Sequence, residues 1–317
     1  MTARGLKQKE EGMRKYLVIG AGGTGGALGA YLARGGMDVT FIARGAHLRA
    51  MKDNGLRVIR TDDEFTLKPV KACTMEEYTD HPDVIFVCVK GYSLESLYPF
   101  LRRIAGKDSI VIPILNIYGT GAVMQKQLPG ILVTDGCIYV ASQLRSPGEI
   151  LMSGDILRVV FGVRDSSEFR PALREIEKDL VKCGIGGGLS DNIQRDALLK
   201  FSYVSPQGAC GLYFGVSAGA MQKEGIYRDF FCELVREIGR IAEKEGIVFT
   251  EDIVKRNLHI LDSLKPDMTT SLQKDVACGK SSEIDGLIFE VVRNARRLKV
   301  DAPAYEKVAE KLSGAAT

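Results

Sequence analysis

The residues of this sequence that could bind a charged ligand begin with a glycine cluster near the N-terminus. The cluster comprises Gly20, Ala21, Gly22, Gly23, Thr24 and Gly25, in the spacing GxGxxG. An apolar run over residues 16–19 predicts a strand before it, and a helical pattern runs on to about Arg34. In that context Gly20 permits a tight turn, Gly22 lets the backbone approach a pyrophosphate, and Gly25 lets the helix pack close to the strand. The motif predicts a dinucleotide at the helix N-terminus, and the alternative is a glycine-rich turn without a ligand.

Arg44 indicates which dinucleotide this would be. Residues 38–43 have the pattern of a second strand, and Arg44 follows it directly. A site selective for NAD usually has Asp or Glu there, because a carboxylate accepts from the ribose 2′-hydroxyl and repels a 2′-phosphate. An arginine does the reverse, since its guanidinium can pair with a phosphate in a fork. We therefore expect NADPH or NADP as the cofactor.

Composition and charge exclude several other classes of function. The chain has 317 residues, a hydrophobic fraction of 45% and a net charge of only +3. It contains no block of five like charges, which argues against a nucleic-acid partner. The longest apolar runs, residues 84–89 and 109–115, are far shorter than the roughly 20 residues that cross a bilayer, so no membrane partner is expected.

The cysteines and histidines favour a reduced protein without a metal. The seven cysteines are widely spaced and form no CxxC, and the three histidines lie far apart. Such spacing predicts neither a disulfide framework nor a metal site. Residues 1–12 are polar and lack the apolar core of a signal peptide, so we expect a cytoplasmic protein. Met13 directly precedes the first strand and is our hypothesis for the native start in place of Met1.

The pattern of strands and helices divides the chain into two parts. Over residues 13–188, strand-like runs alternate with helical segments, which predicts a mainly parallel, doubly wound sheet. Within this part, residues 149–153 and 157–163 are expected as separate strands. Over residues 189–317 nearly every segment has helical periodicity. We therefore predict an α/β protein with an N-terminal, Rossmann-type NADP-binding domain followed by an all-α domain for substrate binding and catalysis.

Segments along nearly the whole chain from Met13 together resemble the ketopantoate reductase (2-dehydropantoate 2-reductase) family. They include IGAGGTGG (19–26), FIARGAHLRAMKDNGLRV (41–58), VCVKGYSLES (87–96), LNIYGTG (115–121), SPGEI (146–150), TTSLQKDV (269–276) and SEIDG (282–286). The second of these, and the last two taken as a pair, are fairly specific to the family. Its members reduce the ketone of ketopantoate to pantoate with NADPH, in the biosynthesis of pantothenate and coenzyme A.

The resemblance implies roles for individual residues on the cofactor side. The glycine cluster would hold the pyrophosphate. Arg44 and Lys90 would flank the 2′-phosphate and the adenine. Asn116 would lie beside the nicotinamide and the substrate, and Ala141 would contact the cofactor through its backbone.

On the substrate side, Lys200 corresponds to the family's catalytic lysine, Ser271 to a substrate-binding serine and Glu283 to the active-site glutamate. Reduction of a 2-oxo acid leaves an alkoxide, which an ammonium group can stabilise and protonate. Glu283 could orient Lys200 or bind a substrate hydroxyl, and Ser271 could bind the substrate carboxylate. The alternatives are a solvated lysine, a favourable carboxylate in the first turn of a helix, and a helix cap.

Four positions depart from the family on the substrate side. The family commonly has asparagine where this chain has Val204, Gly208 and Met268, and its Asn-Gly loop is Asn116-Ile117 here. An apolar pocket would suit ketopantoate less well, so a paralogous reductase of a different 2-oxo acid or ketone remains an alternative. A third alternative is an NADPH-binding protein without catalysis. The oligomeric state, monomer or homodimer, is left open.

Overall fold

The part of the chain that the structure describes, residues 13–314 of a computed structural model, forms two compact units. The sheet unit comprises residues up to 89, 96–114 and 121–189, and the helical unit comprises residues 90–95, 115–120 and 190 onward. Residues 1–12, on which the hypothesis of a start at Met13 depends, lie outside the described part. The assignment of cofactor binding to residues 13–188 and of catalysis to residues 189–317 stays a prediction.

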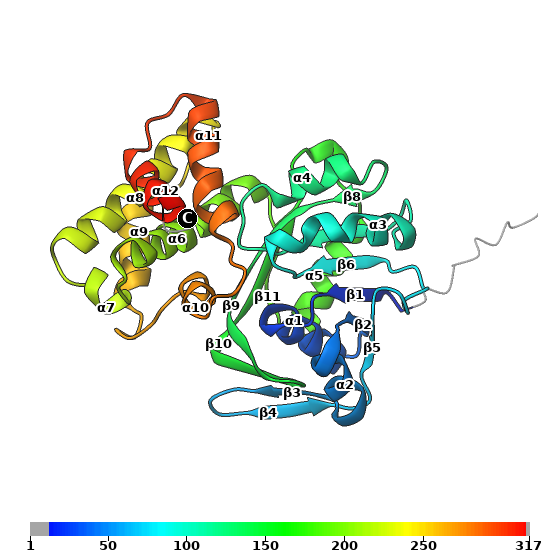
Figure 1. Cartoon of the computed structure of the whole chain (residues 1–317). Helices are drawn as coiled ribbons and strands as arrows, with labels where there is room; N and C mark the ends of the chain where they lie inside the picture. The colour runs from blue at the N-terminus through cyan, green and yellow to red at the C-terminus, as the bar shows by residue number, and fades with distance from the viewer. Residues whose placement is uncertain (1–12, 315–317) are drawn as a thin grey trace, which may run out of the picture. The chain divides into compact units, whose positions relative to one another are not determined.

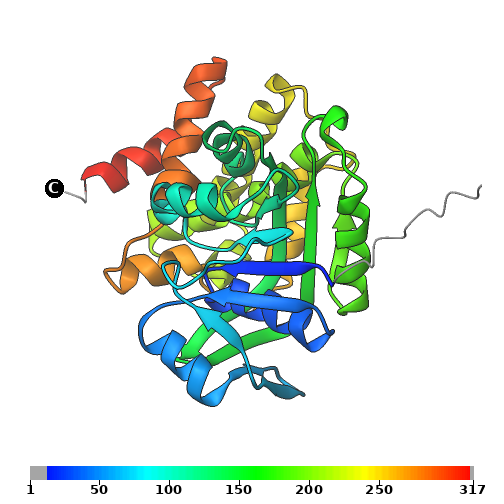
Figure 2. The same ribbon diagram turned by 90° about the vertical axis from the view of Figure 1, so that its right-hand side faces the viewer.

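The sheet unit contains a six-stranded parallel sheet with the order β5-β2-β1-β6-β7-β8 (Figure 1, Figure 2). Its strands are β1 (Lys15–Ile19), β2 (Asp38–Ile42), β5 (Lys71–Cys73), β6 (Val84–Val87), β7 (Ile110–Pro113) and β8 (Leu132–Val133). Leu17 in β1 pairs with Thr40 on one side and with Ile85 on the other, so the direction of winding changes beside β1. This order confirms the predicted Rossmann-type, doubly wound sheet.

Helix α1 (Gly23–Arg34) packs closely on this sheet because most of its buried residues are glycine or alanine. A Cβ atom at Gly25 would overlap the carbonyl oxygen of Gly20, and one at Gly29 would overlap the ring of Phe41. The close packing holds the first turn of α1 directly beyond the end of β1. The remaining helices that connect the strands are α2 (Gly45–Asn54), α3 (Leu94–Ile104), α4 (Thr120–Gln127), α5 (Ala172–Lys182) and the 3₁₀ turns Gly91–Ser93 and Ser166–Glu168.

A second sheet in the same unit has the order β11-β10-β3-β4, with β9 paired to β10. Its strands are β3 (Leu56–Ile59), β4 (Glu64–Leu67), β9 (Asp135–Ser146), β10 (Glu149–Gly162) and β11 (Gly186–Leu189). The expectation of two separate strands over 149–153 and 157–163 was wrong, because both segments belong to β10. Both pair antiparallel with β9, and a shift of register between Met152 and Leu157 marks the irregular stretch between them.

The helical unit is built around its own apolar core. Its helices are α6 (Ile193–Phe214), α7 (Ala218–Met221), α8 (Ile226–Lys244), α9 (Ile253–Asp262), α10 (Ser271–Ala277), a π-helical turn (Asp285–Phe289), α11 (Glu290–Leu298) and α12 (Pro303–Gly314). The unit therefore confirms the predicted all-α part. Within residues 13–314, no helix has both the length and the apolar character needed to span a membrane.

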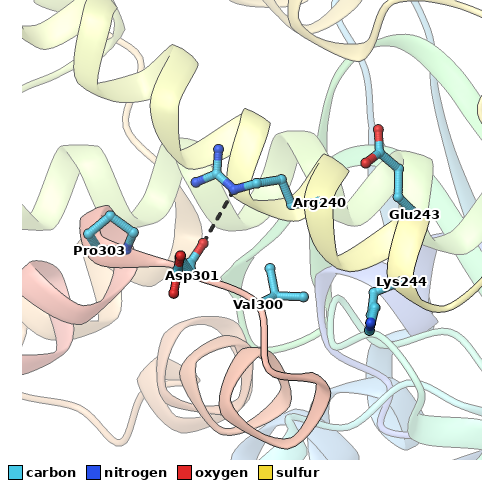
Figure 3. Close-up of a pocket in the computed structure, with 6 residues that line it drawn as sticks. All are labelled: Arg240, Glu243, Lys244, Val300, Asp301 and Pro303. Carbon is cyan, nitrogen blue, oxygen red and sulfur yellow. Dashed lines mark hydrogen bonds between the residues drawn. The ribbon is translucent and has the colours of Figure 1, made fainter.

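An open pocket of about 570 Å³ lies in the helical unit, between the end of α8 and the segment before α12 (Figure 3). Its lining consists of Arg240, Glu243, Lys244, Val300, Asp301 and Pro303. Arg240 Nε donates to the carbonyl oxygen of Asp301 at 3.3 Å. Cationic and anionic side chains are mixed in this lining, and it contains none of the site residues predicted above.

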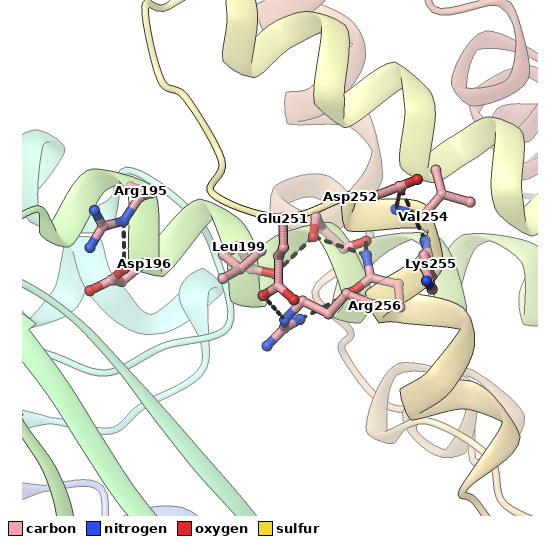
Figure 4. A network of polar contacts seen from close by, with 10 residues as sticks. Arg195, Asp196, Leu199, Glu251, Asp252, Val254, Lys255 and Arg256 are labelled. Carbon is pink, nitrogen blue, oxygen red and sulfur yellow. Dashed lines mark hydrogen bonds and ion pairs between the residues drawn. The ribbon is translucent and has the colours of Figure 1, made fainter.

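Pro206 interrupts the hydrogen bonds of α6, the helix that carries Lys200. A proline has no N–H, so the carbonyl of Ser202, four residues earlier, loses its intrahelical partner. The amide of Asn257, fully buried on α9, replaces that partner, because Nδ2 donates to the carbonyl oxygen of Ser202 at 2.8 Å. Helix α9 is itself held at its start by Asp252, whose side chain accepts from the amides of Val254 and Lys255 (Figure 4).

We predict that Asn257→Leu lowers the free energy of unfolding by about 1–3 kcal/mol, the cost of a buried carbonyl without a partner. Pro206→Ala restores an N–H at position 206, which can then donate to Ser202. In the Pro206→Ala protein, Asn257→Leu should therefore lower the free energy of unfolding by a smaller amount. Urea unfolding of the four proteins of this double-mutant cycle measures the difference. Equal losses in both backgrounds would show that Asn257 does not act through this carbonyl.

Candidate active site

The glycine-rich turn after β1 leaves backbone amides open to an external acceptor. Gly20 has φ +94°, a conformation that favours glycine. Gly22 is the N-cap of α1, makes no side-chain cap hydrogen bond, and has open space within 4 Å of where a Cβ would stand. The free amides and the helix dipole at this end favour an anion. The turn therefore fits the pyrophosphate of a dinucleotide.

Two further residues of the sheet unit that were predicted to contact the cofactor lie on segments next to this turn. Arg44 follows β2 and is the N-cap of α2. Its side chain is exposed, and within residues 13–314 it forms no ion pair. Ala141 lies exposed on β9. A Cβ at Gly23 would lie 2.7 Å from the Cα of Gln143, so the strand that carries Ala141 packs against the turn.

Lys200 and Asn116 are brought together in the helical unit. Lys200 on α6 is only 8% exposed, so the alternative of a solvated lysine is wrong. Its Nζ donates to Asn116 Oδ1 at 2.7 Å. Asn116 lies three residues beyond the end of β7, in the segment 115–120 of the helical unit. The pair presents a buried ammonium group whose orientation is set by an amide oxygen.

Glu283 is held by two donors from the segment 90–95 of the same unit. Its side chain is 4% exposed. Oε1 accepts from the backbone amide of Gly91 at 3.0 Å, and Oε2 accepts from Lys90 Nζ at 3.1 Å. Lys90 also pairs with Asp275 Oδ2 on α10 at 3.0 Å. Burial acts to lower the pKa of Lys90, but the charges of Glu283 and Asp275 outweigh it and the pKa is raised.

In the structure, Lys90 and Glu283 have partners that the sequence did not indicate. Lys90 was expected beside the 2′-phosphate of the cofactor, and in the structure its ammonium lies between two carboxylates. Asp275 was missed as a partner, although it stands in the segment TTSLQKDV that carries the family resemblance. The amide of Gly91 carried no signal in the sequence, because every residue except proline has a backbone N–H.

Ser271 is the first residue of α10 and is exposed. The alternative that it caps this helix is wrong, because the N-cap is Thr270. The side chain of Thr270 accepts from the amide of Gln273, whose own side chain returns to the amide of Thr270 in a capping box. The Ser271 hydroxyl is therefore not needed to start the helix.

Ile117 occupies the space beside Glu283. A Cβ at Gly91 or at Gly286 would overlap the Cδ1 of Ile117, so the absence of a side chain at both positions leaves room for Ile117. The position of a Cβ at Gly91 lies 3.7 Å from Glu283 Oε1, which places the apolar side chain of Ile117 in the surroundings of the carboxylate.

The other three departures from the family pattern lie in or against the helical core. Val204 and Met268 are half-buried and pack on it. Gly208 is buried, and a Cβ there would lie 3.1 Å from Leu272 Cδ2. An asparagine at position 208 would have to displace Leu272. Within residues 13–314, no three His, Cys, Asp or Glu side chains are grouped as a metal ion would require.

The sequence and the fold both match known reductases. Residues 16–166 match the family described as ketopantoate reductase PanE/ApbA, and residues 192–316 match its C-terminal region. The uncharacterized oxidoreductase YkpB of Bacillus subtilis is 26% identical, with 93% of this chain and 96% of that protein covered. The 2-dehydropantoate 2-reductase of Pyrococcus horikoshii is 25% identical, with 95% and 99% covered.

Solved structures show the same fold. A 2-dehydropantoate 2-reductase from Geobacter metallireducens superposes with a TM-score of 0.86 at 21% identity, over 95% of this chain and 99% of that chain. D-mandelate dehydrogenase, solved with NADH and anilino(oxo)acetate, superposes with a TM-score of 0.83 at 21% identity, over 96% and 100% of the two chains. The fold is thus shared by enzymes with different substrates. From the two sequence matches, which together cover most of its length, this chain belongs to the ketopantoate reductase PanE/ApbA family.

Proposed function

We propose that this protein is an NADPH-dependent reductase that converts 2-dehydropantoate to pantoate, a step towards pantothenate and coenzyme A. The observation that carries the proposal is the buried ammonium of Lys200, which donates to Asn116 at 2.7 Å. Burial of a lysine is costly unless the charge is used or paired, so such a group in a reductase family indicates a proton donor. The seven cysteines are all free thiols, which supports a cytoplasmic protein.

Lys200 would act on the oxygen of the substrate ketone. The bound nicotinamide would supply the hydride to the carbonyl carbon. Lys200 would polarise the carbonyl beforehand and then pass a proton from Nζ to the alkoxide oxygen, which gives the 2-hydroxy acid. Asn116 would keep Nζ in position through its amide oxygen, and it remains predicted to contact the nicotinamide and the substrate.

Glu283 would bind a polar group of the substrate from a fixed position. Its carboxylate is held by Gly91 and Lys90, so its orientation does not depend on the substrate. Lys90 in turn is held by Asp275. This chain of contacts supports a role for Lys90 as a positioning residue for Glu283, in addition to the predicted contact with the cofactor phosphate. Ser271, exposed and not needed as a cap, is free to bind the substrate carboxylate.

The preference for NADPH rests on Arg44. Its guanidinium is exposed at the end of β2, the position at which this fold distinguishes the two cofactors. A 2′-phosphate would gain a charge-assisted contact there.

A second candidate is reduction of a different, less polar 2-oxo acid. The observation that favours it is Ile117, whose side chain fills the space between Gly91 and Gly286 beside Glu283. Val204 and Met268 likewise present apolar groups where the family has asparagine. An NADPH-binding protein without catalysis is less well supported, because Lys200 and Glu283 are both present and both held by hydrogen bonds. Assembly into a homodimer stays a prediction.

Turnover of NADPH by the purified protein decides between the two substrates. We expect oxidation of NADPH with 2-dehydropantoate, compared at equal concentration with 2-oxo acids that carry branched apolar side chains. A higher kcat/KM for 2-dehydropantoate supports the first candidate, and a higher value for an apolar 2-oxo acid supports the second. If NADPH binds and none of these substrates is reduced, the reductase proposal is wrong.

Replacement of the proton donor should remove catalysis and spare cofactor binding. We predict that Lys200→Met lowers kcat about 10²- to 10⁴-fold, the usual contribution of general acid catalysis, while the Kd for NADPH changes little. Lys255→Met, on the exposed face of α9, is the matched control and should keep full activity. A Lys200→Met enzyme with more than half of the original kcat would contradict the assignment.

The choice of cofactor should depend on one guanidinium group. We predict that Arg44→Met reduces the preference for NADPH over NADH by about 10- to 100-fold, the value of a hydrogen bond to a charged group. Arg49→Met, exposed on the same helix, is the control. The ratio of kcat/KM for the two cofactors is the measurement. An unchanged ratio would mean that Arg44 does not contact the 2′-phosphate.

A further inference from the structure

His47 on α2 hydrogen-bonds two segments of the sheet unit that are far apart in the sequence. Its Nε2 lies 2.7 Å from the carbonyl oxygen of Ala21, in the middle of the glycine-rich turn. Its Nδ1 lies 2.9 Å from the amide nitrogen of Gly148, in the turn between β9 and β10. The imidazole therefore joins the predicted cofactor-binding turn to a second turn of the same unit.

The two partners determine which form of the ring is present. A backbone N–H can only donate, so Nδ1 must accept from Gly148 and carries no proton. A carbonyl oxygen can only accept, so Nε2 carries the proton and donates to Ala21. Only the neutral ring with the proton on Nε2 makes both bonds. Burial lowers the pKa of His47 against the opposing effect of the Ala21 carbonyl, which is consistent with a neutral ring.

The bond to Ala21 determines the direction of the next amide. The Ala21–Gly22 peptide is trans, and in a planar trans peptide the C=O and the N–H point to opposite sides. With the carbonyl held by His47, the N–H of Gly22 points away from the imidazole. Gly22 is exposed, and the space beside it is open. Because a glycine follows Ala21, the peptide could rotate at low cost if nothing held its carbonyl.

The turn at Gly148 gives His47 a fixed anchor. Gly148 has φ +82°, and its carbonyl oxygen accepts from the amide of Arg57 in β3 at 2.8 Å. A Cβ at Gly148 would lie 3.1 Å from the Cβ of Ala50, so this turn packs closely on α2. His47 is thus held from the side opposite to Ala21, which limits the movement of its ring.

We propose that His47 is a positioning residue for the cofactor, which aims the amide of Gly22 at the pyrophosphate by holding the carbonyl of Ala21. The inference rests on the proposed function, in which the glycine-rich turn binds NADPH. The role belongs to one nitrogen of the ring, Nε2, whereas Nδ1 serves only to anchor the ring to Gly148.

Two substitutions separate the two hydrogen bonds. The side-chain amide of His47→Gln reaches about as far as Nε2 and can donate to Ala21. His47→Asn is shorter, and its oxygen can accept from Gly148 but cannot reach Ala21. The full-length proteins are titrated with NADPH and with adenosine 2′-monophosphate, which has the 2′-phosphate and no pyrophosphate. His81→Asn is the matched control, because His81 Nδ1 lies 2.9 Å from another backbone carbonyl, that of Ile104.

We expect His47→Asn to raise the Kd for NADPH roughly tenfold, as the loss of about one hydrogen bond implies, with unchanged binding of adenosine 2′-monophosphate. His47→Gln and His81→Asn should bind both ligands like the original protein. Equal NADPH affinity in His47→Asn and the original protein overturns the inference and leaves the proposed function intact.

An equal loss of affinity for both ligands in His47→Asn, together with a lower Tm, also overturns the inference. A structural role of His47 alone would explain that result. If the original protein binds neither NADPH nor NADH, the proposed function fails first and the role of His47 fails with it.

Discussion

The helical unit depends on the pairing of charges that it buries. An ammonium and a carboxylate lose their hydration when they leave water. Each is stable inside a protein only if hydrogen bonds from the protein replace the lost contacts with water. Lys200 is compensated by Asn116, and Glu283 by Lys90 and the amide of Gly91. These partners come from two short segments, 90–95 and 115–120, that directly follow β6 and β7 in the chain and belong to the helical unit. The contacts that stabilise these two buried groups are thus the same ones on which the proposed substrate chemistry depends.

The helix that carries Lys200 and the helical segment that follows Glu283 are both irregular, and each irregularity has a hydrogen-bonding partner. Pro206 frees the carbonyl of Ser202, which Asn257 satisfies. The π-helical turn Asp285–Phe289 follows Glu283, and π-helical turns occur frequently at functional sites. Within it, the carbonyl oxygen of Leu287 accepts from Ser205 Oγ at 2.6 Å. The backbone around Lys200 and Glu283 is therefore held by specific side chains from other helices, which suits a site whose groups must be pre-oriented.

In the sheet unit the corresponding constraint is the close approach of α1 to β1. Glycines on the inner face of α1 allow it, and the same approach places the open amides of the first turn where an anion can reach them. Such a turn has many conformations available, because glycine restricts the backbone so little. His47 and the turn at Gly148 supply contacts that select one of them. The segment 41–58, which resembles the family, is thus in direct contact with the glycine-rich turn, and the segment 146–150 is joined to that turn through His47.

The sequence by itself determined the elements that follow from local patterns. The parallel sheet, the helical second part, the glycine-rich turn and the place of Arg44 were all read from periodicity and spacing, and the family resemblance supplied Lys200 and Glu283. The partners of these residues were decided only by the tertiary structure. Lys90 and Glu283 are 193 residues apart, Lys90 and Asp275 are 185 apart, and His47 and Gly148 are 101 apart. Hydrophobic periodicity reports which face of an element is buried and does not report which distant side chain meets it. For the same reason the single strand β10, the cap at Thr270 and the packing of Ile117 against two glycines emerged only from the folded chain.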